Sequence, residues 1–382
     1  MVRIFVFICC LFGTFACQNA GAAPTCGQNQ CVGIVDVGSS GSRFHIYSYR
    51  LDAAKSPTQI KEIWSKKITP GFSTLTANAN TVNNYLNQLF LDSPEKNVKV
   101  YFYATAGMRL LSKVKQQQLY SLAKNWFVAH PEFKLMEAKT ITGSEEGLFA
   151  WLAINYRLNL LGSNREPVSI VDMGGASVQV VTPVDARSNV EPSELVRIKV
   201  QNRSYQLFVH SFLGLGQTEL THQFLDANTC FARNYQLPDG SRAEGDAESC
   251  QTDVTKLINL VHGVDTKVQP IIEANPAKQW YALGGLAILA AQHPFDFENR
   301  EFTSNDLLEK ADSEICRQDW ETVQRQNPNE EAIYNYCLVA SYYYALLVNG
   351  YGLSPQQPIN VLADESANWT LGAVIAQSIQ KH

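Results

Sequence analysis

The sequence lacks the short glycine motifs of three widespread nucleotide and ester chemistries. It contains no Gly-x-x-x-x-Gly-Lys-[Ser/Thr], which excludes a P-loop, and no Gly-x-Ser-x-Gly, which excludes the nucleophile elbow of serine hydrolases. The run Gly38-Ser39-Ser40-Gly41 does not fit Gly-x-Gly-x-x-Gly, so dinucleotide binding is disfavoured. Whatever ligand this chain binds must be held by a different arrangement of residues.

Positively charged residues are fewer than negatively charged ones. Lys and Arg total 31 and Asp and Glu total 36, which gives a formal net charge of −5. A dedicated nucleic-acid-binding protein needs a basic face against phosphates, so we expect no nucleic-acid partner. The same balance does not argue against a nucleotide that brings its own divalent cation. With 382 residues, 45% of them hydrophobic, the chain can bury large cores in two or three domains.

Apolar runs that approach a membrane span are missing after the N-terminus. Residues 1–23 hold Arg3, the apolar run Ile4–Phe15 and then small residues, which is typical of a signal segment. We therefore predict a secreted or periplasmic protein with no transmembrane anchor after processing. Cys17 lies in a loose lipoprotein cleavage box, so lipidation at Cys17 and release of the protein stay open as alternatives.

Cysteine spacing predicts disulfides. No Cys-x-x-Cys and no paired histidines accompany the six cysteines beyond the signal segment, which makes metal ligation the weaker alternative. Six buried free thiols would fit poorly with export. The cysteines fall into near pairs, so we predict the local bridges Cys26–Cys31, Cys230–Cys250 and Cys316–Cys337.

An internal repeat is the most informative feature. Residues 34–43 and 170–179 each contain an apolar run, then Asp-x-Gly, then small residues, then alternating apolar positions. Asp36 and Asp172 occupy the same place in the two segments, 136 residues apart. Apolar alternation on both sides of a Gly/Ser cluster predicts a β-hairpin, and such turns let backbone N–H groups approach an anion. The repeat therefore predicts a duplicated lobe that cradles a nucleotide.

Strands and helices alternate along the chain, which predicts mostly parallel sheets with ligands at the carboxyl ends of the strands. A Gly-Ser-Asn-Arg-Glu-Pro stretch marks the predicted lobe boundary. The expected strands are 98–103, 134–141 and 280–285, the expected helices run to about Phe127 and from Gly143 to about Tyr156, and the boundary stretch is 162–167.

Two aspartates and a pair of glutamates are the candidates for chemistry. Asp36 and Asp172 stand at the ends of apolar strands, where they could share a hydrated divalent cation, or each could cap its own turn. Glu145-Glu146 stands at a helix start and could accept a proton from water. The alternative for this pair is the ordinary preference for acidic residues in a first helical turn.

Four glycine-containing segments together resemble a known family. Residues 35–43, 104–109, 143–147 with Trp151, and 172–179 are similar, in order, to the first four apyrase conserved regions of the ecto-nucleoside triphosphate diphosphohydrolases. This resemblance implies an α/β, two-lobe actin-like or RNase H-like fold with duplicated mixed sheets and a central nucleotide cleft. It also implies hydrolysis of nucleoside tri- and diphosphates with Mg²⁺ or Ca²⁺. The chain looks most like the soluble apyrases that bacterial pathogens secrete.

The resemblance also assigns roles by position. Glu146 matches the catalytic base, Asp36 and Asp172 match the acids that hold the metal, and Ser177 and Gln179 match residues that position the attacking water. The implied phosphate-binding set is Gly38, Ser39, Ser40, Gly41, Ser42, Arg43, Thr105, Gly107, Gly174, Gly175, Ala176, Ser177 and Gln179.

We also predict the bounds of the two lobes and the residue that stacks on the nucleotide base. We expect one lobe from 24–160 plus 361–382, a second from 161–360, and a monomer. The region 282–288 lacks the aromatic residue usual for stacking on the base, and Tyr334 is the substitute candidate, so base preference stays open. Two alternatives to an apyrase are an exopolyphosphatase-like phosphatase and a catalytically silent nucleotide-binding or host-interaction protein.

Overall fold

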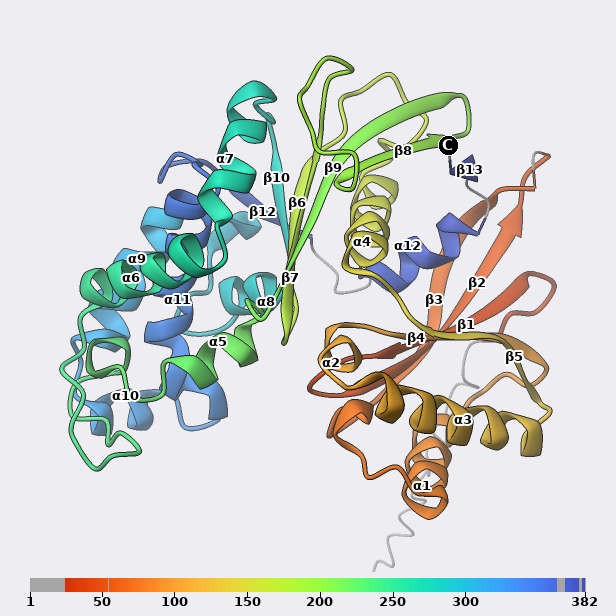
Figure 1. Ribbon diagram of the computed structural model, residues 1–382, viewed down its shortest axis with the longest axis horizontal. Helices are drawn as coiled ribbons and strands as arrows, with labels where there is room; N and C mark the ends of the chain where they lie inside the picture. The colour runs from red at the N-terminus through yellow and green to blue at the C-terminus, as the bar shows by residue number, and fades with distance from the viewer. Residues whose placement is uncertain (1–24, 54, 363–367, 378–379, 382) are drawn as a thin grey trace, which may run out of the picture.

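Two mixed β-sheets with helices make up the described part of the chain, which is residues 25–53, 55–362, 368–377 and 380–381 of a computed structural model. Each sheet forms the centre of one lobe (Figure 1). The predicted signal segment lies outside the described residues. None of the helices in the described ranges is both long and apolar enough to cross a membrane.

The first sheet has five strands in the order β3-β2-β1-β4-β5. Strands β1, β2 and β3 are antiparallel neighbours, whereas β4 and β5 run parallel to β1. Helices α1 and α3 pack together on this sheet (Figure 1). The elements are β1 (Gln30–Val37), β2 (Ser42–Leu51), β3 (Pro57–Ile68), α1 (Ala79–Phe90), β4 (Val98–Ala104), α2 (Ala106–Arg109), α3 (Lys113–Ala129) and β5 (Phe133–Thr140).

The second sheet has eight strands in the order β11-β12-β10-β6-β7-β9-β8-β13. Most of the helices that follow β9 gather beside it as a helical subdomain (Figure 1). The strands are β6 (Ser169–Met173), β7 (Ser177–Pro183), β8 (Leu195–Val200), β9 (Arg203–Leu213), β10 (Trp280–Gly284), β11 (Glu301–Phe302), β12 (Ile359–Val361) and β13 (Gln380–Lys381). The helices are α5 (Gln217–Gln223), α6 (Ala247–Lys256), α7 (Val264–Ala274), α8 (Gly285–Ala291), α9 (Ser304–Ala311), α10 (Trp320–Gln326) and α11 (Tyr336–Tyr344).

The two sheets repeat one topology, as the sequence repeat predicts. Strand β1 is antiparallel to β2 and parallel to β4, and strand β6 is antiparallel to β7 and parallel to β10. The register pairs Asp36 with Arg43 in the first hairpin and Asp172 with Gln179 in the second. The duplicated hairpins are therefore equivalent in three dimensions.

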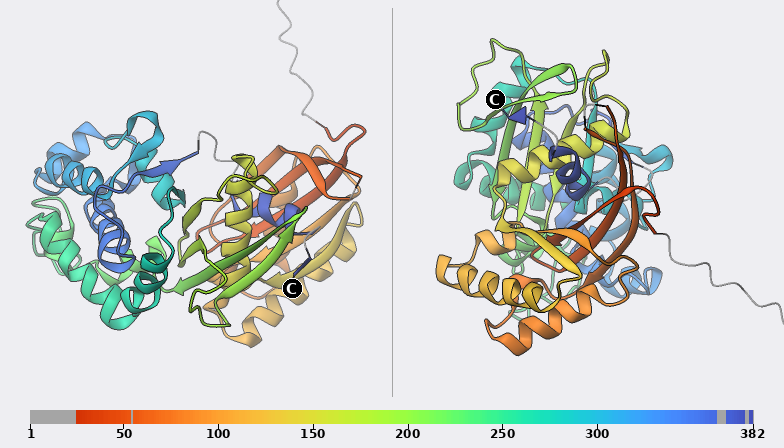
Figure 2. Two further views of the ribbon diagram at one scale, coloured as in Figure 1. Left: turned by 90° about the horizontal axis from the view of Figure 1, so that it is seen from above. Right: turned by 90° about the vertical axis from the view of Figure 1, so that its right-hand side faces the viewer.

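Two helices form a layer between the sheets, α4 (Gly143–Arg157) and α12 (Trp369–Ala376) (Figures 1 and 2). Helix α4 packs on β6, β7 and β9, while α12 packs on α4 and on β1, β2 and β3. Residues 146–155 of α4 and 369–375 of α12 are buried on every side of their helices, and most of these residues are apolar. This layer joins the two lobes into a shared core.

The C-terminal segment does more than the predicted packing on the first lobe. Helix α12 contacts the first sheet as expected, and Leu371, Val374 and Ile375 are buried. The chain then returns to the second sheet, where β13 pairs antiparallel with β8. The division of the chain at residues 160 and 361 stays a prediction.

The three predicted disulfides are present. Their Cα atoms are 6.0 Å apart in Cys26–Cys31, 4.9 Å apart in Cys230–Cys250 and 5.2 Å apart in Cys316–Cys337. The last two bridges lie fully buried in the core of the helical subdomain. Cys230–Cys250 ties α6 to the 3₁₀ turn Asn228–Cys230, and Cys316–Cys337 ties α11 to the π-helical turn Asp312–Cys316 that continues α9, so both bridges link helical elements of this subdomain.

Candidate active site

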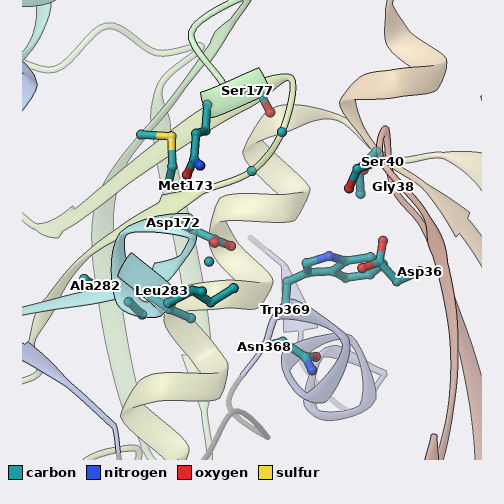
Figure 3. A pocket seen from close by; sticks show the side chains of 18 of the residues that line it. Asp36, Gly38, Ser40, Asp172, Met173, Ser177, Ala282, Leu283, Asn368 and Trp369 are labelled. Atoms are coloured by element: carbon teal, nitrogen blue, oxygen red, sulfur yellow. The ribbon is translucent and has the colours of Figure 1, made fainter. Parts of the chain in front are cut away.

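A cavity of about 770 Å³ opens between the two sheets, at the duplicated hairpins (Figure 3). That volume lies within the range of small-molecule and cofactor sites. Its floor is formed by the two glycine-rich turns, which come from opposite lobes. Asp36, Gly38 and Ser40 face it from one side, and Asp172 and Ser177 from the other (Figure 3).

The two turns lie against each other because one of them carries no side chain at the contact. A Cβ atom on Gly175 would stand 2.5 Å from the Ser39 Oγ of the first turn, so a side chain at this position would displace the Ser39 hydroxyl. The start of α5 supports the second turn from below, since the backbone N–H groups of Gln217 and Thr218 each donate to a turn carbonyl 2.9 Å away. The result is a cradle with small residues from both lobes, which suits a phosphate chain.

The two aspartates end β1 and β6 on opposite walls of the cavity (Figure 3). Burial raises the pKa of Asp36 to about 6, although the positive charges of His45, Arg43 and Lys67 oppose the shift. Burial also raises the pKa of Asp172 to about 7, and the negative charge of Asp36 adds to that shift. The pair is therefore in an unfavourable state when both carboxyls are ionised.

A divalent cation fits this pair of carboxyls. The Asp36 Oδ1 atom is buried and finds no hydrogen-bond partner among the described residues. Carboxylate oxygens are the ligands that Mg²⁺ and Ca²⁺ prefer, and a cation would remove the repulsion between the two aspartates. The donor set thus matches a hard cation that also binds phosphate oxygens.

The two adjacent glutamates of α4 have different surroundings. Glu145 completes a capping box with Thr142, in which each side chain accepts from the other residue's backbone N–H at 2.9–3.1 Å. Glu146 instead lines the cavity and is only 6% exposed. The helix-start alternative therefore explains Glu145 and does not explain Glu146.

Burial raises the pKa of Glu146 to about 8. The charge of Arg109 lowers this pKa, while the charges of Asp172 and Asp36 raise it further. A cation between the aspartates would reverse the sign of their influence and favour the ionised form of Glu146. A carboxylate with a pKa near neutrality is suited to accept a proton from water.

Gln179 contacts both Glu146 and Ser177. The Gln179 Nε2 amide, which has two hydrogens, lies within donating distance of three acceptors: Glu146 Oε2 at 3.2 Å, Ser177 Oγ at 2.8 Å and Ser211 Oγ at 3.0 Å. Ser177 lines the cavity, whereas Gln179 is fully buried behind it and is not among the lining residues. The three predicted catalytic side chains are thus brought together by β7 and the start of α4.

Most of the predicted phosphate-binding residues line the cavity. Gly107 does not, because it packs beneath the first turn, where a Cβ would stand 2.7 Å from Ser39 Cα. Its role is to let α2 approach that turn. The lining residues from the predicted set are Gly38, Ser39, Ser40, Gly41, Ser42, Arg43, Thr105, Gly174, Gly175, Ala176 and Ser177.

Several lining residues were given no site role from the sequence. Trp369, the first residue of α12, stands beside Asp36, and Asn368 precedes it on the cavity wall (Figure 3). No local sequence pattern places these two residues near the hairpins, because they lie almost 200 residues after the second hairpin. Lys67, Gln217, Thr218 and Arg300 also line the cavity.

One arm of the cavity is mostly apolar and runs along β10 and α8. Ala282, Leu283 and Ile288 line it, together with Phe297 from the loop that follows α8. Tyr334 does not, because its ring stacks on Tyr235 with 6.2 Å between centroids, on the helical subdomain. The sequence-based choice of Tyr334 for this arm is wrong, and Phe297 is the aromatic residue that the fold brings there.

Comparison with known proteins agrees with this geometry. The pattern of the GDA1/CD39 (nucleoside phosphatase) family matches residues 24–381, so the chain belongs to that family and is a nucleoside phosphatase. "Probable apyrase 4" of Arabidopsis thaliana is 25% identical over 97% of this chain and 85% of its own length. "Golgi apyrase" of Schizosaccharomyces pombe is 28% identical over 78% of this chain and 61% of its own length. The resemblance to the apyrases is confirmed, while the likeness to secreted bacterial apyrases stays a prediction.

Solved structures share the fold. Nucleoside triphosphate hydrolases from Neospora caninum superpose with a TM-score of 0.60 at 16% identity, over 91% of this chain and 92% of theirs. An Aquifex aeolicus Ppx/GppA protein gives 0.56 at 15% identity, over 91% and 97%. These likenesses confirm the predicted two-lobe actin-like α/β fold.

Proposed function

We propose that the protein is an apyrase that removes terminal phosphates from nucleoside tri- and diphosphates by direct attack of water. The observation that carries this proposal is a buried Glu146, linked to Ser177 through Gln179, in a cavity that two glycine-rich turns line from opposite lobes. Asp36 and Asp172 would hold Mg²⁺ or Ca²⁺, which when bound neutralises charge on the phosphates. Export of the protein through residues 1–23 is part of the proposal, and its three disulfides support that part.

Each residue would perform one task in the reaction. Glu146 accepts a proton from water as the water oxygen attacks the terminal phosphorus; the bond from that phosphorus to its bridging oxygen breaks, and the bridging oxygen leaves on the shortened nucleotide. Ser177 orients that water, and Gln179 acts from behind the cavity, where it holds the Glu146 carboxylate and the Ser177 hydroxyl. The N–H groups of both turns and the Thr105 hydroxyl balance charge on the phosphate oxygens, which is the main demand of phosphoryl transfer.

The apolar arm would hold the nucleoside, which favours an apyrase over an exopolyphosphatase-like enzyme. A polyphosphate chain carries charge along its whole length and gains nothing from a surface of Ala282, Leu283, Ile288 and Phe297. A base can stack on an aromatic ring, which is worth about 1–3 kcal/mol for nucleic-acid bases.

Phe297→Ala should therefore raise the KM for ATP about 5- to 100-fold, because that is the range in which loss of base stacking falls. The KM for inorganic tripolyphosphate should change less than about twofold. Steady-state phosphate release with both substrates measures this. Tyr334→Ala is the matched control, since it removes an aromatic ring of the same lobe that faces away from the cavity. An equal increase in the KM for ATP and the KM for tripolyphosphate in Phe297→Ala would contradict binding of the nucleoside in this arm.

A further inference from the structure

Arg109 connects the first lobe to the proposed base and to the second sheet. It ends the short helix α2 in the first lobe, and its guanidinium makes an ion pair with Glu146, Nη2 to Oε2. The same Nη2 stands 3.4 Å from Ser177 Oγ, and Nη1 stands 3.4 Å from Ser211 Oγ on β9. The side chains of Arg109 and Glu146 are 16% and 8% exposed.

Ser211 closes this set of contacts into a ring. Its hydroxyl lies within accepting distance of Arg109 Nη1 and of Gln179 Nε2, and the same Nε2 lies within donating distance of Glu146 and Ser177. Every side chain that touches the Glu146 carboxylate is therefore fixed by at least one further contact. Such a ring restricts the carboxylate to one orientation.

Gly143 is the position at which the backbone makes room for the ring. A Cβ there would stand 2.8 Å from Arg109 Nη1 and closer still to Ser211. The first residue of α4 must therefore be glycine for Arg109 and Ser211 to meet in front of the helix. Gly143 belongs to the third of the four motifs, residues 143–147, but it does not line the cavity. The close approach of Arg109 and Ser211, and not a contact with phosphate, explains why this position is glycine.

We propose that Arg109 is a positioning residue for the hydrolytic reaction: with Ser211 it holds the Glu146 carboxylate towards the site of the attacking water. This inference rests on the proposed function, because it assumes that Glu146 is the base. Arg109 itself is not among the residues that line the cavity, although its neighbours Thr105 and Ala106 are. It acts through Glu146 and does not bind the phosphates.

Ionisation of Glu146 follows from the same contact. The charged groups that face Glu146 are Arg109 from α2, Asp36 from β1 and Asp172 from β6. Burial and the two aspartates raise the pKa of Glu146, and Arg109 is the group that lowers it. Loss of the guanidinium should therefore move the acid limb of kcat to higher pH, by about 1–3 units for a close opposite charge.

A double-mutant cycle tests the proposal. In steady-state phosphate release from ATP at saturating Mg²⁺, Arg109→Met should lower kcat about 10²-fold or more, because it disables general-base help. In a Glu146→Gln background, the same change should lower the residual rate less than about threefold, because two residues that act as a unit are not additive. The dissociation constant for a non-hydrolysable ATP analogue, measured by calorimetry, should stay within about threefold of wild type.

Arg109→Lys is the second variant, because it keeps a positive charge but loses the forked donor. It should lower kcat while it moves the acid limb less than Arg109→Met does, and thermal melting verifies that both variants fold. Lys139→Gln is the matched control, since Lys139 pairs with the neighbouring Glu145 and not with Glu146, and its kcat should match wild type.

Two results would overturn the inference while leaving the proposed function intact. One is an equal loss from Arg109→Met or Arg109→Lys in the wild-type and Glu146→Gln backgrounds. The other is a tenfold or greater weakening of analogue binding, which would make Arg109 a phosphate-binding residue. Failure of the proposed function gives a different result, namely a Glu146→Gln enzyme with the wild-type rate.

Discussion

Glu146→Gln should lower kcat for ATP about 10²- to 10⁴-fold while nucleotide binding is retained. General-base catalysis contributes a factor of this size, and an amide cannot accept the proton of the attacking water. The substitution preserves shape, and a Gln side chain can still accept from Arg109, so the cradle around the phosphates should persist. Steady-state kinetics with calorimetric binding of a non-hydrolysable analogue separates the loss of turnover from a loss of affinity.

Glu145→Gln is the matched control for that experiment. It changes the neighbouring residue of the same helix in the same way, and glutamine can replace glutamate in a capping box with Thr142. We expect its kcat to lie within about threefold of wild type, since it leaves the contacts of Glu146 in place. A Glu146→Gln enzyme that turns over as fast as the Glu145→Gln enzyme would show that Glu146 is not the base.

Asp172→Asn should raise the concentration of Mg²⁺ or Ca²⁺ needed for half-maximal activity by at least about 10- to 100-fold. Even residues that only support a metal ligand cost that much when they are changed, and Asp172 is proposed as a ligand itself. The substitution should weaken cation binding without lowering the stability of the fold, because burial and, to a smaller degree, the charge of Asp36 disfavour the ionised form of the Asp172 carboxyl. Activity as a function of free cation measures the first effect and thermal melting the second.

The cation-free protein gives a readout that is independent of activity. The pKa of Asp172 is raised from 3.8 to about 7, so its contribution to stability is present at low pH and is lost as pH rises from about 4 to about 7. In chelator, the melting temperature should fall over that range, and it should fall less in Asp172→Asn. Asp246→Asn is a control, since Asp246 caps α6 away from the cavity. An Asp172→Asn protein with wild-type cation dependence would contradict the two-aspartate site.

The sequence predicts the cradle well because its signals are local. Asp36 and Asp172 each follow an apolar strand and precede a glycine-rich turn, so one short pattern reveals the strand, the turn and the carboxyl. Because the pattern occurs twice, it also predicts two equivalent hairpins, and the registers of Asp36 with Arg43 and Asp172 with Gln179 agree with that. Near pairing of cysteines predicts the disulfides for the same reason, since each bridge closes a short loop.

Tertiary contacts account for what sequence reasoning missed. Arg109 belongs to a recognised motif, yet its partner Ser211 lies 102 residues away on another sheet, and nothing local indicates their meeting. Phe297 follows no periodic pattern and reaches the cavity only because the chain turns back after α8. Tyr334 looked suitable because it is aromatic and close to a cysteine, but stacking on Tyr235 draws it into the helical subdomain.

Phosphate release from ATP, ADP and inorganic tripolyphosphate, with and without chelator, decides whether the protein is a cation-dependent apyrase. We expect the purified protein to release phosphate from ATP and ADP in Mg²⁺ or Ca²⁺, with tripolyphosphate as the poorer substrate, and we expect all release to stop in excess chelator. Full activity in chelator would contradict the role of Asp36 and Asp172. A folded protein that binds ATP and releases no phosphate with either cation would contradict the claim that it is an apyrase.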